Sequence, residues 1–510
     1  MHNMKITTVT KGILFAWVLF VLLLLSCNNT VGESSPEGKK LAITYCGSCH
    51  ALTEPALLDK NTWSQDILPL MGKKLGIDYI YEMPLQGAGK PLISLEDFKK
   101  IADWYYKNAP DTMPAQGRLP ISEFTNMFAV KTMALGEGQF PSASYIKIDP
   151  GNHWIYAANG FDSSVSIYND QLMLLAKNPV QGTLIDMDFD DSLQNPGTRK
   201  GVLTLIGIMN PNDLKTGSVY SFSVSEKGVF SSSNKLIDSL PRPVQTISGD
   251  LDMNNIPDYL VCGFGNTTGG FFWVRPDSKI EQQDLRAFPG AVKAYTNDFN
   301  NDGRPDIIVL MAQAQEGIYL FINKGNGQFD GQEVLSFPAI YGSSYFELDD
   351  FNNDGFKDLL YTCGDNADYS GNVLKNYHGL YIFLNDGKNH FSQKYFFPIN
   401  GCYKAMARDF DKDGDLDIAA ISYFPDTKKQ PQESFVYLEQ VAGFQFTPYT
   451  IKEFNEGKWL TMDSGDADGD GDDDIVLGSL VPPYEAQQQK WKKEAKQKAA
   501  FLLLENRHYQ

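Results

Sequence analysis

The sequence predicts two folded parts, a small all-α domain followed by a larger all-β domain built as a seven-bladed propeller. The chain has 510 residues, which is more than the ~250–300 residues that one hydrophobic core usually holds. Helical periods end near residue 115, and a strand–loop–strand pattern recurs through the rest of the chain. The composition, 42% hydrophobic and 21% charged, is that of a globular protein.

The N-terminus has the features of an export signal. Two lysines precede an apolar run at 12–25, which is shorter than the ~20 residues that span a bilayer. Leu24-Leu25-Ser26-Cys27 resembles a bacterial lipobox, which implies cleavage before Cys27 and acylation of its thiol; a plain signal peptide with an incidental Cys27 is the alternative. The sequence therefore predicts a lipoprotein signal peptide (1–26), a tether (27–36) and an exported protein. This protein would be anchored by lipid to a bacterial membrane and face the periplasm or the cell surface.

Residues 46–50, Cys-Gly-Ser-Cys-His, carry the attachment pattern for c-type haem. Two thiols one helical turn apart, Cys46 and Cys49, suit covalent addition to the two vinyl groups of one porphyrin, while the His50 imidazole reaches the iron. A zinc site would need four ligands, and no second Cys-x-x-Cys is present to complete it. A thioredoxin-like redox pair is the other alternative, although its βαβ surroundings are missing.

A helical haem domain is expected over residues 37–115. The predicted helices span 61–71 and 94–106. Methionine is a soft ligand that suits low-spin haem iron. The stretch from Trp63 to Gly76 resembles a bacterial family of cytochrome c domains in which a Trp-led helix delivers this ligand. The resemblance implies Met71 as the second axial ligand, with Met83 as the alternative. The predicted fold class is therefore a small all-α cytochrome c domain followed by an all-β seven-bladed propeller.

Five aspartate-rich loops share one nine-residue pattern, with oxygen-bearing side chains at positions 1, 3, 5 and 9. Position 6 is Gly in four loops and Asn255 in the first, the two residue types that best tolerate a positive φ. Four such oxygens and a backbone carbonyl at position 7 supply the hard ligands that Ca²⁺ prefers. The predicted ligands are Asp250, Asp252, Asn254 and Asp258; Asp298, Asn300, Asp302 and Asp306; Asp350, Asn352, Asp354 and Asp358; Asp409, Asp411, Asp413 and Asp417; and Asp466, Asp468, Asp470 and Asp474.

These loops differ from EF-hands, because an Asp three residues after the bend leads directly into an apolar strand. Successive loops begin 48, 52, 59 and 57 residues apart, which is the period of a four-stranded propeller blade. A second element, an apolar strand before a turn, recurs seven times and is clearest at 317–323 and 379–385. The two repeats together predict seven blades.

On these loops the chain resembles the FG-GAP or VCBS repeat family, the type found in integrin α-subunit propellers. The resemblance covers about residues 136–510 and implies Ca²⁺ at about five sites. The last blade lacks an outer strand, which residues 124–135 of the linker and closing strand (116–135) would supply, removing a sheet edge. Residues 484–500 are expected to form a helix inserted into that blade.

The net charge of −19 argues against nucleic acid as a partner, because phosphate binding needs a basic face. Cys262, Cys363 and Cys402 cannot all pair with one another, and buried free thiols are expected; one disulfide among the three is the alternative, and the sequence does not choose its partners. Catalytic residues are unknown. Asp365 and His378 are the acid–base groups to examine, with no role assigned to either.

The haem is the group with an evident chemical capability. The sequence therefore predicts a lipid-anchored electron-transfer protein whose Ca-binding propeller is a docking or substrate-recognition platform, and whose partner is a redox protein or a small-molecule electron donor. One alternative is a dehydrogenase that passes electrons from a propeller-bound substrate to the haem; pyrroloquinoline-quinone enzymes also use propellers, but the seven Trp here show no blade-periodic motif. The other is a Ca-dependent glycan- or protein-binding module.

Overall fold

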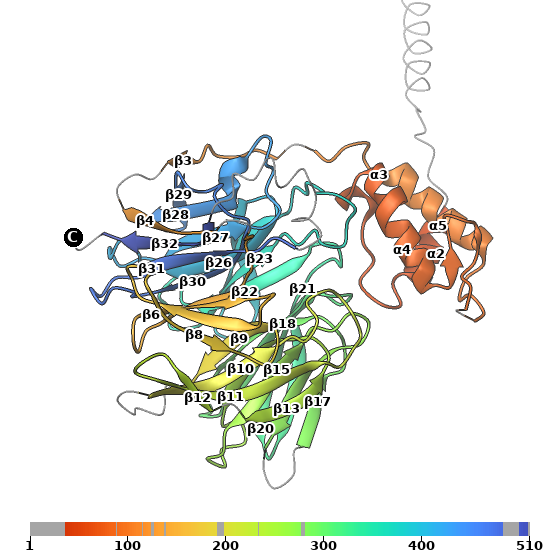
Figure 1. Cartoon of the computed structure of the whole chain (residues 1–510). Helices are drawn as coiled ribbons and strands as arrows, with labels where there is room; N and C mark the ends of the chain where they lie inside the picture. The colour runs from red at the N-terminus through yellow and green to blue at the C-terminus, as the bar shows by residue number, and fades with distance from the viewer. Residues whose placement is uncertain are drawn as a thin grey trace, which may run out of the picture. The chain divides into compact units, whose positions relative to one another are not determined.

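The computed structural model describes residues 36–87, 89–114, 116–123, 127–136, 139–190, 198–232, 234–276, 281–482 and 499–507 (Figure 1). The chain divides into two compact units, one holding the described residues up to 48 together with 58–111, the other holding 49–57 and the residues from 112 onward. The predicted signal peptide and Cys27 lie outside the described residues, as does most of the predicted helix at 484–500.

The first unit contains short helices. Its elements are α2 (Pro36–Tyr45), α3 (Lys60–Thr62), the π-helical turn η2 (Trp63–Ile67), α4 (Leu68–Lys74), β1 (Ile77–Asp78), β2 (Met83–Pro84) and α5 (Leu95–Asn108). Ser94 caps α5 by accepting the Asp97 N–H at 3.1 Å. Helices α2 and α5 approach closely at Gly38, where a Cβ atom would lie 2.4 Å from the Lys100 carbonyl oxygen. Trp63 is buried in the core of this unit.

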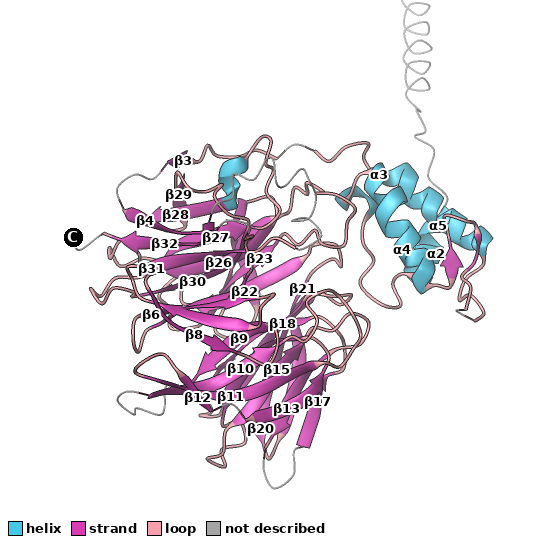
Figure 2. Cartoon of the chain, in the orientation of Figure 1, coloured by secondary structure: helices cyan, strands magenta, loops and turns pink. Residues whose placement is uncertain are grey.

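The predicted fold class is wrong in its first part, because the described residues contain no small all-α cytochrome domain. The chain is nearly all β, and the longest described helix, α5, has 14 residues (Figure 2). The first unit also contains an antiparallel strand pair in which Ile77 faces Pro84 and Asp78 faces Met83. The pair forms because Gly76, at φ 82°, ends the preceding helix and Glu82, at φ 53°, reverses the chain. Helical periodicity around this segment did not reveal the hairpin.

The second unit is a seven-bladed β-propeller, as predicted (Figure 2). The first three blades are β5 (Ala143–Asp149) to β8 (Leu174–Pro179), with β6 (Trp154–Asn159) and β7 (Ser164–Tyr168); β9 (Leu184–Phe189) to β13 (Lys235–Leu240), with β10 (Thr198–Leu205), β11 (Gly217–Ser225) and β12 (Phe230–Ser232); and β14 (Pro243–Gly249) to β17 (Glu281–Arg286), with β15 (Asp258–Gly263) and β16 (Gly270–Arg275).

The remaining four blades follow in chain order. They are β18 (Ala291–Asn297), β19 (Asp306–Met311), β20 (Gly317–Gly325) and β21 (Gln328–Ser336); β22 (Ser343–Asp349), β23 (Asp358–Cys363), β24 (Gly379–Asn385) and β25 (Phe391–Pro398); β26 (Cys402–Arg408), β27 (Asp417–Ser422), β28 (Phe435–Ala442) and β29 (Gln445–Thr450), joined by β3 (Ser122–Glu123); and β30 (Trp459–Gly465), β31 (Asp474–Ser479) and β32 (Ala499–Asn506), joined by β4 (Phe128–Ala134).

The core lies between adjacent blades. Second strands such as β19 and β23 are buried along their whole length, because both of their faces contact neighbouring sheets, whereas the outer strand β21 is largely exposed. One cluster joins Ile308 and Leu320 of the fourth blade to Phe346 and Tyr361 of the fifth. Their apolar, β-branched and aromatic side chains account for the continuous hydrophobic runs in the sequence.

Strand β4 closes the ring. It pairs antiparallel with β32, from Phe128 opposite Asn506 to Ala134 opposite Ala499, and so takes the outer position that the sequence analysis assigned to residues 124–135. Lys131 of β4 forms an ion pair with Glu505 of β32. The last sheet therefore has four strands, with β4 as its outer strand.

A ring of polar contacts joins the seven inner strands. Each inner strand sends one side chain to the backbone of the inner strand of the next blade. The contacts are Tyr145 to Met187 O (3.0 Å), Asp188 to Ser248 N (2.8 Å), Gln245 to Ala294 N (2.7 Å), Tyr295 to Phe346 O (3.2 Å), Glu347 to Ala407 N (2.9 Å), Lys404 to Met462 O (2.7 Å) and Asp463 to Ile148 N (2.9 Å). These contacts run around the whole ring. They supply hydrogen-bond partners to backbone groups of the inner strands that are not paired with another strand.

Candidate functional site

The five aspartate loops all join an inner strand to the second strand of the same blade. They follow β14, β18, β22, β26 and β30 and lead into β15, β19, β23, β27 and β31. Because each connects the same two strands of a repeated antiparallel sheet, the five loops lie at the same end of the propeller. The third to seventh blades carry them.

The loop backbone wraps around the carboxylate at position 1. In the second loop, Asp298 accepts the N–H of Asp302 at 3.1 Å and that of Gly303 at 2.7 Å. The bend at position 6 has the positive φ that the sequence predicted, 82° at Gly303 and 66° at Asn255. This Asx-type turn directs side chains 1, 3 and 5 to one side of the loop.

The carboxylate at position 9 joins the loop to the third strand of the blade through hydrogen bonds. Asp306 is fully buried, accepting the Phe299 N–H at 2.9 Å and the Asn323 N–H of the third strand at 2.8 Å. Asp358 and Asp474 make the same pair of contacts in their blades, with partners from the loop and from the third strand. Position 9, assigned as a ligand from sequence, therefore has a structural task that local pattern did not reveal.

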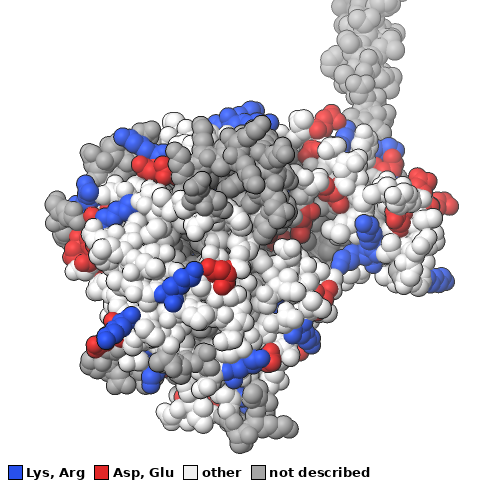
Figure 3. Space-filling view, viewed as in Figure 1, with Lys and Arg blue, Asp and Glu red and all other residues white. Residues whose placement is uncertain are grey.

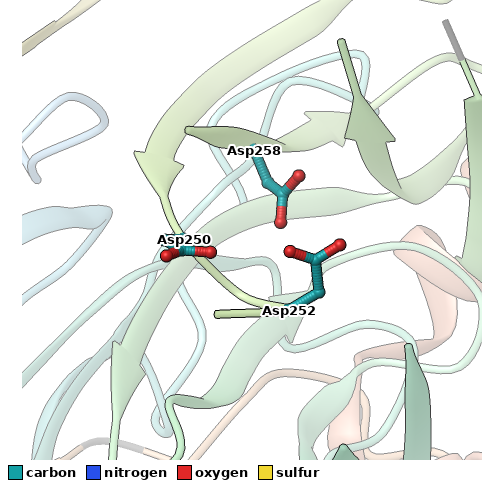
Figure 4. A group of neighbouring side chains, drawn as sticks. All are labelled: Asp250, Asp252 and Asp258. Carbon is teal, nitrogen blue, oxygen red and sulfur yellow. The ribbon is translucent and has the colours of Figure 1, made fainter. Parts of the chain in front are cut away.

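The first loop brings three carboxylates together. Asp250, Asp252 and Asp258 offer oxygens that all lie within 4.8 Å of one another, and Figure 4 shows their side chains converging. Oδ1 of Asp252 and Oδ1 of Asp258 are buried with no hydrogen-bond partner among the described residues. Burial, with Asp252 nearby, raises the pKa of Asp258 to about 6. A divalent cation would give these unpartnered oxygens a ligand bond and neutralise the repulsion between the carboxylates.

The fourth and fifth loops each form a comparable group from positions 1, 3 and 5. These groups are Asp409, Asp411 and Asp413, and Asp466, Asp468 and Asp470. The structure adds Asp415 and Asp472 at position 7, which the sequence analysis counted for its backbone carbonyl alone. Both oxygens of Asp472, and Oδ1 of Asp415, are buried without a hydrogen-bond partner in the described part of the chain. Burial and the adjacent carboxylates raise the pKa of Asp472 to about 6.

The second and third loops carry fewer negative charges than the fourth and fifth, because position 3 is an amide. Asn300 donates to Asp302 at 2.9 Å, and Asn352 donates to Asp354 at 2.8 Å. The Arg304 side chain also pairs with Asp302. The residues of all five loops fit a hard divalent cation, and the first, fourth and fifth hold the most unneutralised carboxylate oxygens.

The first two blades use fixed side chains at the corresponding places. In the first, the fully buried Asp149 receives the Arg199 guanidinium through Nε at 3.0 Å and Nη2 at 2.7 Å. In the second, Asp186 and Asp188 accept the N–H groups of Thr246 and Ser248. These carboxylates hold adjacent blades together; residues 191–197 lie outside the described chain.

The Cys-x-x-Cys-His segment directly follows α2. The Cys46 N–H donates to Ala42 O at 2.9 Å, which continues the helix, and a turn carries the chain to Cys49. Nδ1 of His50 lies 2.8 Å from Ala51 O. A proton donated there leaves Nε2 with the lone pair that a metal requires.

The two methionine candidates differ in their surroundings. Met71 lies in α4 and is half-buried, whereas Met83 lies in β2 and is 41% exposed. Several large apolar side chains of the first unit are also exposed, including Ile43, one turn before Cys46, and Ile80 and Tyr81 beside Met83.

The acid–base candidates and the remaining cysteines are structural. His378 is fully buried, neither ring nitrogen has a hydrogen-bond partner among the described residues, and burial holds its pKa well below the usual range. Asp365 N–H bonds to the Gly342 carbonyl in a tight junction between blades. Cys262, Cys363 and Cys402 are buried thiols, as predicted.

On the face drawn in Figure 3, Lys and Arg are interspersed with Asp and Glu. None of the described helices has the length and apolar content needed to cross a bilayer.

Residues 298–361 match the family described as an FG-GAP-like repeat. A T-cell immunomodulatory protein homolog from Plasmodium falciparum (isolate 3D7) is 33% identical over 144 residues, covering 24% of this chain and 19% of that protein. The chain thus spans less than two thirds of the length of that relative. The matched repeat lies within the propeller, and residues 24–27 and 46–50 lie outside it.

Solved structures resemble the chain at low sequence identity. The virginiamycin B lyase of Staphylococcus aureus is 10% identical, with 74% of this chain and 98% of that chain covered and a TM-score of 0.45. The Pan2 WD40 domain of Neurospora crassa is 9% identical, with 70% and 94% covered and a TM-score of 0.42. The blade count itself follows from the strand pairing. The chain therefore carries an FG-GAP-like repeat within a seven-bladed β-propeller, a fold that suggests a binding or recognition platform.

Proposed function

We propose that the protein is a calcium-stabilised recognition platform that carries a covalent c-type haem and transfers single electrons while anchored to a bacterial membrane through a lipid on Cys27. The observation that carries the calcium part is the group of buried, unpartnered carboxylate oxygens in the first, fourth and fifth aspartate loops. Crowded carboxylates without a counter-ion are costly inside a protein, and Ca²⁺ both neutralises and orders them.

Calcium would stabilise the fold by holding the aspartate loops in place. In the first loop Asp250, Asp252 and Asp258, at positions 1, 3 and 9, would hold the ion. In the other loops positions 1, 3 and 5 would hold it, Asp415 and Asp472 would add ligands in the last two, and position 9 would tie the liganded loop to the third strand of the blade. Because the ion binds the folded state, its binding free energy adds to the free energy of unfolding.

The calcium proposal is tested by thermal unfolding of the purified protein with Ca²⁺ and with EGTA. EGTA is expected to lower the melting temperature, and the melting temperature should rise with Ca²⁺ concentration. Asp411→Asn and Asp470→Asn should each reduce this calcium-dependent shift. Asp330→Asn, an exposed acid of β21 outside the loops, is the matched control and should leave the shift unchanged. Equal melting temperatures in EGTA and Ca²⁺ would exclude the calcium role.

The haem proposal rests on the attachment motif and on the His50 geometry. Cys46 and Cys49 would hold the porphyrin through thioether bonds, and His50, oriented through Nδ1 toward Ala51 O, would present Nε2 to the iron. Met71 is the proposed second axial ligand, and Met83 is the alternative. Bound haem supplies one-electron oxidation and reduction.

The haem proposal is tested by producing the full chain in a host that matures c-type cytochromes. A Soret band that survives denaturation, together with a mass increase of one haem, is expected for the wild type and not for the Cys46→Ser/Cys49→Ser double variant. Loss of the Met–iron charge-transfer band in Met71→Ala, and not in Met83→Ala, would identify the axial ligand. Matured material without a Soret band would rule out haem attachment, whatever the outcome of the calcium experiment.

A further inference from the structure

A hollow of about 410 Å³ lies between the third and fourth blades. Its walls are the outer strand β17 of the third blade and the strands β20 and β21 of the fourth, which are labelled at the lower end and right side of the propeller in Figure 1. The volume is within the range of small-molecule sites. Neither the aspartate loops nor the haem motif contributes to it.

The hollow exists because one pair of repeats diverges at two positions. The third strands of the fourth and fifth blades align residue for residue, so that Tyr319 corresponds to Tyr381. In the fifth blade the cross-strand partner of Tyr381 is Phe396, whose ring lies 4.4 Å away and fills the space. In the fourth blade the partner of Tyr319 is Glu333. A polar side chain therefore stands where the neighbouring repeat places an aromatic one.

Gly331 enlarges the same space. It faces Phe321 across the strands, and a Cβ atom on it would lie 2.7 Å from that ring. In the fifth blade the corresponding partner of Phe383 is Gln393. The fourth blade thus has a glutamate and a glycine where the fifth blade has a phenylalanine and a glutamine, and the hollow lies beside these two residues.

Fixed hydrogen-bonding groups line this space. The Arg286 guanidinium lies 3.7 Å from the centre of the Tyr319 ring and contacts the Gln315 side chain. The Nε of Arg286 is buried without a hydrogen-bond partner among the residues that the structure describes. The Tyr319 hydroxyl lies 3.3 Å from Glu333 Oε1, so the acid is oriented as well. Asp284 and Gln283 lie on the opposite wall.

We infer that this hollow binds a sugar ring of a carbohydrate. Each sugar hydroxyl both donates and accepts a hydrogen bond, and the hollow offers both partners: the carboxylates of Glu333 and Asp284 accept, and Arg286 and the Gln283 amide donate. The apolar flanks of Leu285 and Phe329 suit the C–H faces of the ring. The wall charges, two acids against one guanidinium, disfavour polyanions. The inference is independent of haem and calcium.

The test is binding of the calcium-loaded full chain to neutral oligosaccharides and to uronate-containing oligosaccharides, first on an array and then by calorimetry. Glu333→Gln and Arg286→Met should each weaken the affinity for a bound saccharide about tenfold, since each removes a charge-assisted hydrogen bond. Binding of neutral saccharides would support the inference, and preference for uronate-containing saccharides would contradict the charge argument on which it rests.

Matched controls lie on the same blade. Lys324 and Asp330 form an exposed pair at 3.9 Å outside the hollow, so Lys324→Met and Asp330→Asn change the same charges without touching it, and both should retain full affinity. Circular dichroism and the melting temperature show whether each variant is folded. Absence of saccharide binding tighter than about 10 mM by the folded wild type would overturn the inference, as would binding that Glu333→Gln and Arg286→Met leave unchanged.

Discussion

At the scale of single residues, the aspartate loops depend on two positions with different tasks. Position 6 must have a positive φ, which reaches 82° at Gly303 and 99° at Gly414. Position 9 must accept two backbone N–H groups, which a carboxylate does with its two oxygens, as at Asp306. The first requirement is visible in the sequence because glycine marks it. The second is not, because the second donor, Asn323, is 17 residues further along the chain.

Gly303→Ala tests the first requirement. Alanine is expected to lower the free energy of unfolding by about 1–2 kcal/mol, because an L-residue is strained at this φ. No heavy atom lies within 4 Å of the added Cβ, so the effect is conformational and not a clash. Gly249→Ala, equally open but without a positive φ, is the control and should change stability by less than about 0.5 kcal/mol. Chemical denaturation measures both; equal effects would refute the conformational explanation.

At the scale of elements, the turn between β21 and β22 is held by a buried acid from another loop. Glu316, which directly precedes β20, is 3% exposed and accepts the Ser343 N–H at 3.0 Å and the Ser343 hydroxyl at 2.7 Å. Burial raises the pKa of Glu316 to about 7. Lys375, on the loop between β23 and β24, is buried nearby, and burial lowers its pKa to about 8. In both side chains burial disfavours the charged form, which raises the pKa of the acid and lowers the pKa of the amine.

The raised pKa of Glu316 makes stability depend on pH. The native state holds this proton to a higher pH than the unfolded chain, whose Glu has the ordinary value of 4.5. The stabilisation is therefore complete below about pH 4.5 and is lost as the pH rises toward 7, by up to about 3 kcal/mol. Glu316→Gln cannot ionise, so its melting temperature relative to the wild type should rise from pH 5 to pH 8 in saturating Ca²⁺. A difference that is independent of pH would show that Glu316 does not titrate in this range.

At the scale of the whole molecule, the ring of inner-strand contacts makes the seven blades one unit. Each blade contributes a donor or an acceptor to the next, and Asp463 returns the circuit from the last blade to Ile148 of the first at 2.9 Å. Strand β4 closes the same junction at the outer edge through its pairing with β32. The first and last blades are thus joined at both the inner and the outer ends of the sheet.

Asp463→Leu is expected to lower the free energy of unfolding by about 1–3 kcal/mol, because the Ile148 N–H loses its acceptor. Asp463→Asn keeps an acceptor oxygen and should recover most of this loss. Differential scanning calorimetry of the three proteins in Ca²⁺ measures the effect. If Asn and Leu destabilise equally, the negative charge and not the hydrogen bond is what matters at this junction.

The sequence by itself determined the positions of the five aspartate loops, the blade period and the buried thiols, because each of these leaves a local or periodic pattern in the chain. It also located the closing strand, since a last blade without an outer strand needs one from elsewhere. It failed for the first unit, where residues 77–84 pair as a hairpin although no alternating pattern marks them.

Only the tertiary structure decided which carboxylate oxygens remain unpartnered, among them both oxygens of Asp472, and that Arg286 and Glu333 share a hollow. The physical reason is that these relations join atoms on different strands or blades. Sheet packing brings together hydrogen-bond partners such as Asp306 and Asn323, or Asp463 and Ile148. The spacing of these residues along the chain follows no pattern from which the contacts could be predicted.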